Sequence, residues 1–238
     1  MTRATAEEHR GPSVQEDMRG LGIAQRVALI SAFALVYPLL VLAGLSLRGE
    51  AENLTIIWPA AGLLFMTLFL TARRLWIWIV AIQVIVEITV SAFHAHHFTI
   101  LEYAPYALAN SIDGMVGAAI ASRLMVEPQI PRVRNMLRFI AAVAIGAGAG
   151  AVLGAFATSH TLGGADYLRD WQLWWAGNWL GSLCIAPVIM SWAVRLRARE
   201  LSAPPAPPLE IMLVGAALLA MTIWVFSAPP PESCATSQ

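Results

Sequence analysis

Three polar residues that stand inside strongly apolar segments are the candidates for chemistry in this sequence. Glu87 lies in the run Val-Ile-Val-Glu-Ile, and Asn110 and Asp113 lie in the run Ala-Asn-Ser-Ile-Asp-Gly. An ionisable side chain at the centre of a membrane helix costs about 2.5–3.5 kcal/mol on insertion scales, so it marks a functional site by default. Asn110 and Asp113 are three residues apart and share one helix face. The pattern predicts a site for a polar ligand or an ion; the alternative is a hydrogen-bonded pair that fixes helix register.

Motifs for catalysis are absent from the sequence. It has no nucleophile elbow, phosphate-binding glycine loop, zinc-protease motif or kinase signature. The histidines His94, His96 and His97 fall in one predicted loop, where a solvated role explains them better than metal binding. Net charge is zero, and membrane topology accounts for the arginines. We therefore expect no enzyme activity, no cofactor, no metal site and no nucleic-acid partner.

Composition indicates that lipid surrounds the elements that carry these residues. Of the 238 residues, 58% are hydrophobic and 13% are charged, whereas soluble domains carry about a quarter charged residues. About 20 apolar residues are needed for a helix to cross a hydrocarbon core of roughly 30 Å. Seven segments approach this length: 23–47, 56–72, 75–93, 103–125, 136–159, 171–193 and 209–226. The predicted fold class is all-α, a polytopic transmembrane helical bundle of about seven helices.

The predicted boundaries divide the chain into three parts. Residues 1–22 are polar and lack an apolar core before a small-residue cleavage site, so we expect a disordered cytoplasmic lead rather than a signal peptide. Residues 23–226 form the membrane-embedded domain. Residues 227–238 form a proline-rich tail, which an odd number of spans places outside the cytoplasm.

Arginine positions predict the orientation. Cytoplasmic loops carry the excess of positive charge. Four arginines precede or begin the first segment, two lie between the second and third, four flank the break between the fourth and fifth, and three follow the sixth. The opposite loops contain only Arg48 and Arg169. We expect a multi-pass protein of a bacterial inner membrane with a cytoplasmic N-terminus.

Glycines at four-residue spacing predict close helix packing. They are Gly146, Gly150 and Gly154 in the fifth segment, and Gly177 and Gly181 in the sixth. This spacing lets two helix backbones approach each other. The partner is expected to be another helix of the same bundle rather than a second copy of the chain, although a homodimer is left open.

Three motifs carry a resemblance to a known family. They are Ile-Trp-Pro-Ala-Ala-Gly at 57–62, Ala-Asn followed by Gly-Met-Val-Gly-Ala within 109–118, and Trp-Trp-Ala-Gly-Asn-Trp-Leu-Gly at 174–181 followed by Ala-Pro at 186–187. Together they resemble the bacterial membrane-associated sensor domain of the first MASE type, from about residue 53 to residue 193. The resemblance implies a sensory domain of the inner membrane, normally fused to a histidine kinase or to an enzyme of cyclic-di-GMP metabolism.

Two departures from that family pattern stand out. Asn178 occupies a position where family members often have an acidic residue. Family domains also usually continue through another helix into a cytoplasmic output module, and we expect both to be missing here. Output would then pass through a separate signalling partner in the membrane.

All three motifs begin segments that run inward from the outer face, so their residues can converge on one ligand pocket. The predicted pocket residues are Trp58, Pro59, Gly62, Asn110, Asp113, Trp175, Asn178 and Gly181. The alternative is that they only shape a compact bundle. The leading hypothesis is a sensory domain that relays an unknown signal by helix rearrangement. A small transporter or channel subunit and a truncated, non-functional sensor remain alternatives.

Overall fold

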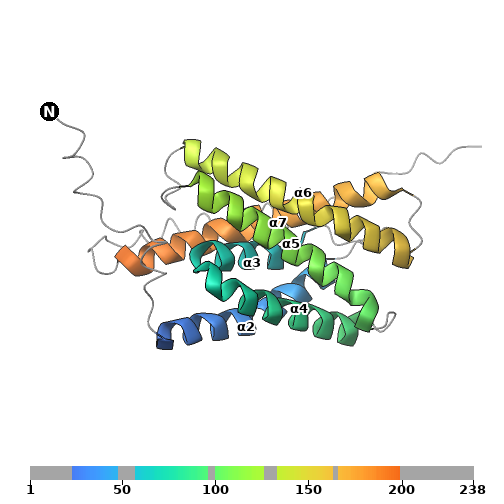
Figure 1. Cartoon of the computed structure of the whole chain (residues 1–238), viewed down its shortest axis with the longest axis horizontal. Coiled ribbons are helices and arrows are strands. Elements are labelled where there is room, and N and C mark those ends of the chain that lie inside the picture. Colours follow the sequence, from blue (N-terminus) through green and yellow to red (C-terminus); the bar gives the residue numbers. More distant parts are fainter. Residues whose placement is uncertain (1–22, 48–56, 96–99, 126–132, 163–165, 199–238) are drawn as a thin grey trace, which may run out of the picture. The chain divides into compact units, whose positions relative to one another are not determined.

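The described part of the chain is entirely helical. The computed structural model describes residues 23–47, 57–95, 100–125, 133–162 and 166–198. Within these ranges the helices are α2 (Ile23–Ser46), α3 (Pro59–Leu70), α4 (Arg73–Ala95), α5 (Ile100–Leu124), α6 (Val133–Leu162) and α7 (Tyr167–Ala198) (Figure 1). The predicted all-α class is confirmed. The predicted lead 1–22, the segment 209–226 and the tail 227–238 lie outside the described residues.

Four of the described helices are long and apolar enough to cross a membrane. Their candidate spans are Arg26–Ser46, Arg73–His94, Val133–Thr161 and Tyr167–Ala193. Large apolar side chains point away from the bundle along these helices, including Leu35 and Leu39 on α2 and Phe156 on α6. Exposed apolar surface of this kind is stable only against lipid or protein. The prediction of a polytopic helical bundle in a membrane is confirmed.

α3 and α5 are not among these four spans, although the sequence predicted spans at 56–72 and 103–125. α3 is also shorter than its predicted segment. Pro59 occupies its first turn, where a missing backbone N–H costs nothing. The helix ends at Leu70, and the Thr71 hydroxyl then bonds back to the Thr67 carbonyl oxygen at 2.6 Å. Its 12 residues extend about 18 Å at 1.5 Å per residue. Ten of these residues are buried, so α3 is an internal helix.

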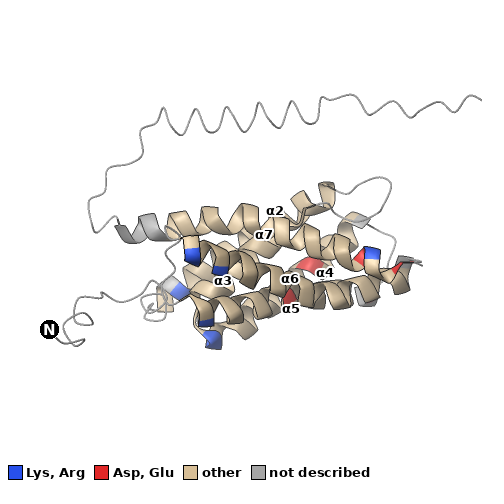
Figure 2. Ribbon diagram, turned by 90° about the horizontal axis from the view of Figure 1, so that it is seen from above, with Lys and Arg blue, Asp and Glu red and all other residues tan. Residues whose placement is uncertain are grey.

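The helices up to Arg197 belong to one compact unit. α5 packs along α6 and also contacts α3 and α4, while α2 packs on α3 and α4. The core contains α3 side chains such as Phe65, which meets Phe139 of α6 edge to face. Figure 2 shows that most of the described arginines gather at one end of this bundle.

Candidate functional site

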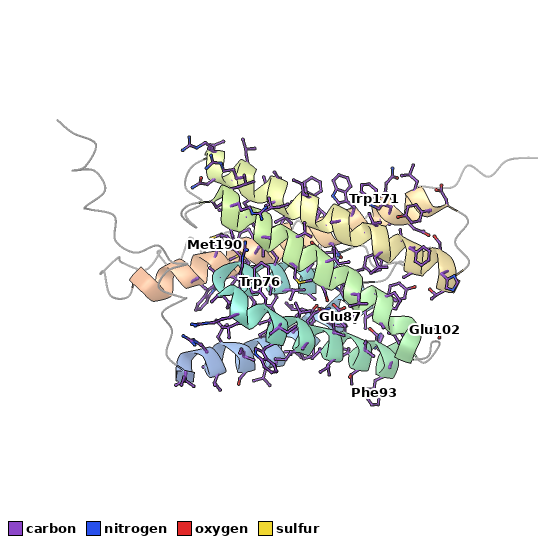
Figure 3. All side chains as sticks on the ribbon, in the orientation of Figure 1. Trp76, Glu87, Phe93, Glu102, Trp171 and Met190 are labelled. Atoms are coloured by element: carbon purple, nitrogen blue, oxygen red, sulfur yellow. The ribbon has the colours of Figure 1, made fainter. Side chains whose placement is uncertain are left out.

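Glu87 is the centre of a buried set of hydrogen bonds between helices. It lies on α4 with 4% of its surface exposed, and Figure 3 shows it inside the bundle, whereas Phe93 of the same helix points outward. The Tyr37 hydroxyl of α2 donates to Glu87 Oε1 at 2.5 Å. The Asn110 amide of α5 donates to both carboxyl oxygens at 3.1 Å. Glu87 thus links three helices.

Asn178 of α7 extends this set to a fourth helix and to the second buried carboxyl group. Its amide nitrogen donates to Asn110 Oδ1 and to Asp113 Oδ2, both at 2.9 Å. Asn178 and Asp113 are each 3% exposed. We call Tyr37, Glu87, Asn110, Asp113 and Asn178 the polar cluster. Every hydrogen bond described within it runs between two different helices.

A second polar contact lies one helical turn from Glu87 along α4. The Ser111 hydroxyl of α5 donates to Gln83 Oε1 at 2.5 Å, and the Gln83 amide donates to the Ala107 carbonyl oxygen at 3.0 Å. Gln83 and Ser111 are almost completely buried. These contacts fix the register of α4 against α5 beside the cluster.

The two carboxyl groups of the cluster have no ion-pair partner among the described residues. Removing a carboxylate from water is expensive unless hydrogen bonds or an opposite charge compensate it. Here the compensation comes from neutral donors: three donated contacts reach Glu87, and one reaches Asp113. A buried group held in this way responds strongly to any movement of its donors.

The residues before α3 dock directly on α7. The Trp58 backbone N–H donates to the Gly177 carbonyl oxygen at 3.0 Å. A Cβ atom at Gly181 would collide with the Trp58 carbonyl group, and one at Gly62 would lie 2.8 Å from Ile185 Cβ. Glycine is therefore required at both positions for α3 and α7 to meet. Pro59 starts α3 at this contact.

Trp58 also reaches α2 through its side chain. A Cβ atom at Gly44 of α2 would lie 2.6 Å from Trp58 Cε3, so the indole ring lies directly against that helix. The indole nitrogen is buried without a hydrogen-bond partner among the described residues. Trp58 thus contacts α2 through its ring and α7 through its backbone.

Trp175 takes a different place from the other predicted pocket residues. Its ring stacks between those of Trp171 and Trp179, with centroids 5.6 and 5.2 Å away. Its indole N–H donates to the Ala144 carbonyl oxygen of α6 at 2.9 Å. Trp175 therefore anchors α7 to α6 and makes none of the hydrogen bonds described in the polar cluster.

The glycines of α6 divide between two partners. A Cβ atom at Gly146 would lie 2.7 Å from the Asp113 carbonyl oxygen and 2.8 Å from the Gly117 backbone, and one at Gly150 would lie 2.5 Å from the Ala109 carbonyl oxygen. Both therefore face α5 beside the cluster. Gly154 faces the ring of Trp174 on α7 instead.

The structure thus brings most of the predicted residues together in two adjoining groups. Asn110, Asp113 and Asn178 bond to one another, and Trp58, Pro59, Gly62 and Gly181 form the α3–α7 contact. The predicted pocket left out Tyr37, Gln83 and Glu87. Glu87 was predicted separately as a candidate functional residue, and its four-residue spacing from Gln83 on one helix face was the available signal for joining the two. Nothing in the sequence around Tyr37 indicates its role.

No group of three metal-ligating side chains occurs among the residues that the structure describes. His96 and His97 lie outside them.

Comparison with protein families gives a match over most of the chain. The family model MASE1 matches residues 27–235, so the whole polar cluster and the α3–α7 contact lie within the matched region. No curated protein and no solved structure matches the chain.

Proposed function

We propose that this chain, which belongs to the MASE1 family of membrane sensory domains of signalling proteins, detects a signal in a bacterial inner membrane and relays it by rearranging its helices. The polar cluster carries the proposal, because a few hydrogen bonds join α2, α4, α5 and α7 at one buried point. A change at that point alters the packing of all four helices at once. The domain itself is not catalytic.

The orientation of the proposal rests on the arginines. At one end of the bundle lie the starts of α2, α4 and α6 and the end of α5, and the arginines of these segments gather there (Figure 2). The rule that cytoplasmic ends carry positive charge places this end in the cytoplasm. The N-terminus is then cytoplasmic, and the α3–α7 contact faces the outer half of the membrane.

The signal is proposed to act where the α3–α7 contact adjoins the polar cluster. A ligand shifts a conformational equilibrium only by binding one state more tightly than the other. Trp58 touches α2 and α7, and its backbone N–H bonds to Gly177, the residue before Asn178 of the polar cluster. A ligand that displaces Trp58 would therefore affect the packing next to the cluster. Membrane lipid surrounds the domain. The signal passes to a histidine kinase or to an enzyme of cyclic-di-GMP metabolism in a separate signalling partner, and the chain acts either alone or as a homodimer.

The test uses the chromosomal gene. We expect deletion to change either intracellular cyclic-di-GMP or phosphorylation of a response regulator, and the wild-type gene to restore it. Asp113→Asn keeps the side-chain shape but replaces a hydrogen-bond acceptor with a donor, so it should restore folded protein but not the output. Asp170→Asn is the matched control, because Asp170 bonds only to Ser159 among the hydrogen bonds described for its side chain. Equal output from both variants would contradict a relay through the cluster.

A transporter remains the second candidate because of the two buried carboxyl groups. Such groups mark ion pathways in many transporters. Purified full-length protein in liposomes that contain a pH-sensitive dye would distinguish the two functions. A sensor should give no proton flux above empty liposomes, whereas proton flux that Asp113→Asn abolishes would favour transport.

A further inference from the structure

The stretch that ends α5 and begins α6 is rich in arginine. Between residues 123 and 138 the sequence has four arginines and one acidic residue. Arg123 lies in the last turn of α5, and Arg134 and Arg138 lie in the first two turns of α6. Arg134 and Arg138 are four residues apart on one helix, where two like charges repel each other. A negative charge beside them would relieve this repulsion.

The packing of α5 against α6 sets the level of these arginines. A Cβ atom at Gly146 of α6 would lie 2.7 Å from the Asp113 carbonyl oxygen of α5, and one at Gly117 of α5 would lie 3.5 Å from the Ala142 carbonyl oxygen of α6. A step of four residues forward along α5 is therefore matched by a step of four residues backward along α6.

The same antiparallel register continues to the arginines. It pairs Ala121 with Arg138 and Met125 with Arg134. Arg123 therefore lies at a level between the two arginines of α6. Figure 2 shows that the described arginines gather at this end of the bundle.

The turn of the two helices brings Arg123 and Arg138 to one flank of the α5–α6 contact. At about 100° per residue, Arg123 is rotated by about 80° from Asp113 around the axis of α5. Arg138 is rotated by about 80°, in the same sense, from Gly146 around the axis of α6. Because the helices run in opposite directions, equal rotations turn both side chains to the same side.

No hydrogen bond or ion pair is described for the side chains of Arg123, Arg134 and Arg138 in the part of the chain that the structure covers. Arg73 at the same end differs, because its guanidinium group lies 5.8 Å from the centre of the Trp76 ring. The rule for cytoplasmic ends requires positive charge here. It does not require three arginines at one level on two adjacent helices without a described partner.

An apolar track continues from Arg138 along α6. Ile145 and Val152 follow Arg138 at steps of seven residues, close to two helical turns, so all three project to nearly the same side of the helix. The two apolar side chains are 53% and 55% exposed. Val152 lies about 21 Å beyond Arg138, which exceeds the roughly 15 Å depth of one leaflet of the hydrocarbon core. An acyl chain can therefore follow this track along its whole length.

We propose that these three arginines bind one anionic phospholipid of the cytoplasmic leaflet. Its phosphate lies between Arg123 of α5 and the two arginines of α6, and one acyl chain lies along the apolar track. Guanidinium groups suit a phosphate because they donate paired hydrogen bonds to its oxygen atoms. Basic sites between membrane helices on the cytoplasmic side bind anionic headgroups. This lipid site goes beyond the sensory function and does not depend on it.

Titration of the full-length protein in detergent micelles with dioleoyl phosphatidylglycerol tests the site, with bound lipid counted by native mass spectrometry. Dioleoyl phosphatidylcholine has the same acyl chains but no net charge, so it is the reference lipid. A salt concentration of about 150 mM screens distant charges. We expect phosphatidylglycerol to bind more tightly than phosphatidylcholine, and equal affinities would overturn the proposal.

Arg123→Gln together with Arg138→Gln should weaken phosphatidylglycerol binding about thirtyfold, as expected for about 1 kcal/mol per arginine, and should leave phosphatidylcholine binding unchanged. The matched control is Arg26→Gln with Arg73→Gln, which removes the same charge from the starts of α2 and α4. It should leave both affinities nearly unchanged. Equal losses in the two double variants would overturn the site, because they would indicate only a diffuse basic surface.

Two further measurements complete the test. Arg134→Gln changes an exposed side chain and should weaken phosphatidylglycerol binding about fivefold; it tests the site even if the double variant does not fold, and an unchanged affinity would overturn it. Glycerol 3-phosphate, which has the phosphate but no acyl chains, should not displace the lipid at equal concentration. Displacement would mean that the arginines bind free phosphate rather than a lipid. All these measurements use purified protein, so their failure leaves the gene-deletion test of the sensor unaffected.

Discussion

Alanine substitutions along α6 give the sharpest test of the packing that positions the cluster. At Gly146 a Cβ atom would lie 2.7 Å from the Asp113 carbonyl oxygen, and at Gly150 it would lie 2.5 Å from the Ala109 carbonyl oxygen. Both neighbours are backbone atoms, which cannot rotate away. At Gly148, on the same helix, the nearest atom is 3.6 Å away on the Trp171 side chain. Gly148→Ala is therefore the matched control.

The size of the effect follows from these distances. Ordinary contact begins at 3.4 Å, so α5 and α6 would have to separate by about 0.7 Å for Gly146→Ala and about 0.9 Å for Gly150→Ala, as the differences from 3.4 Å require. Overpacking of this kind costs about 1–3 kcal/mol, and a gap of 0.5–1 Å forfeits a quarter to a half of each neighbouring contact. Replacing glycine by alanine in a helix returns about 1 kcal/mol. Gly148→Ala should keep the stabilisation from replacing glycine in a helix, without the destabilisation from overpacking.

Unfolding by sodium dodecyl sulfate in mixed micelles, followed by tryptophan fluorescence, measures the three variants. We expect Gly146→Ala and Gly150→Ala to unfold with a free energy about 1–3 kcal/mol lower than that of Gly148→Ala. Equal stability of the three would refute the reasoning, because it would mean that α5 and α6 are not in backbone contact at these positions.

Three further predictions concern the cluster, the α3–α7 contact and the topology. Asn178→Ala removes the donor to Asp113 and Asn110 and should lower the free energy of unfolding by about 1–3 kcal/mol in the same assay; an unchanged value would mean that the cluster contributes nothing to stability. Gly181→Ala places a Cβ atom against the Trp58 carbonyl group and should reduce the yield of monodisperse protein in size-exclusion chromatography below that of Gly148→Ala, and an equal yield would argue against the contact. A reporter that is active only in the cytoplasm should be active when fused after Glu200, and inactivity there would reverse the proposed orientation.

The sequence was sufficient for the fold class and for the family, because both depend on features that are local in the chain. Apolar runs of about 20 residues predict membrane helices regardless of their neighbours. The three motifs that suggested the membrane-associated sensor domain lie inside the region 27–235 that the family model matches, so the predicted family is confirmed. The pocket itself stays a prediction.

The interhelical contacts could not be predicted in the same way. Asn110 and Asp113 were grouped because they share one helix face. Asn178, 65 residues beyond Asp113, was predicted to join them only because the three motifs begin segments that run inward from the same face, and its individual hydrogen bonds were not predicted. Tyr37 lies 50 residues before Glu87, and an aromatic residue among apolar neighbours resembles ordinary core. Partners on different helices are set by packing, and a single sequence carries no signal for which faces meet.

α3 begins later than the sequence predicted, and this late start explains the contacts that Trp58 makes. Hydropathy predicts a segment from 56 to 72 because it counts apolar residues, but Pro59 delays the start of the helix. The backbone at Trp58 is therefore not helical at the level of Gly177, one residue from Asn178 of the polar cluster. Irregular backbone inside a membrane is tolerated only where protein covers it and satisfies its polar groups, and the hydrogen bond from the Trp58 N–H to the Gly177 carbonyl oxygen does so. A helix that began at residue 56 would place Trp58 in its first turn. Its backbone N–H would then no longer donate to the Gly177 carbonyl oxygen. The late start of α3 is thus what allows Trp58 to contact α2 with its ring and α7 with its backbone.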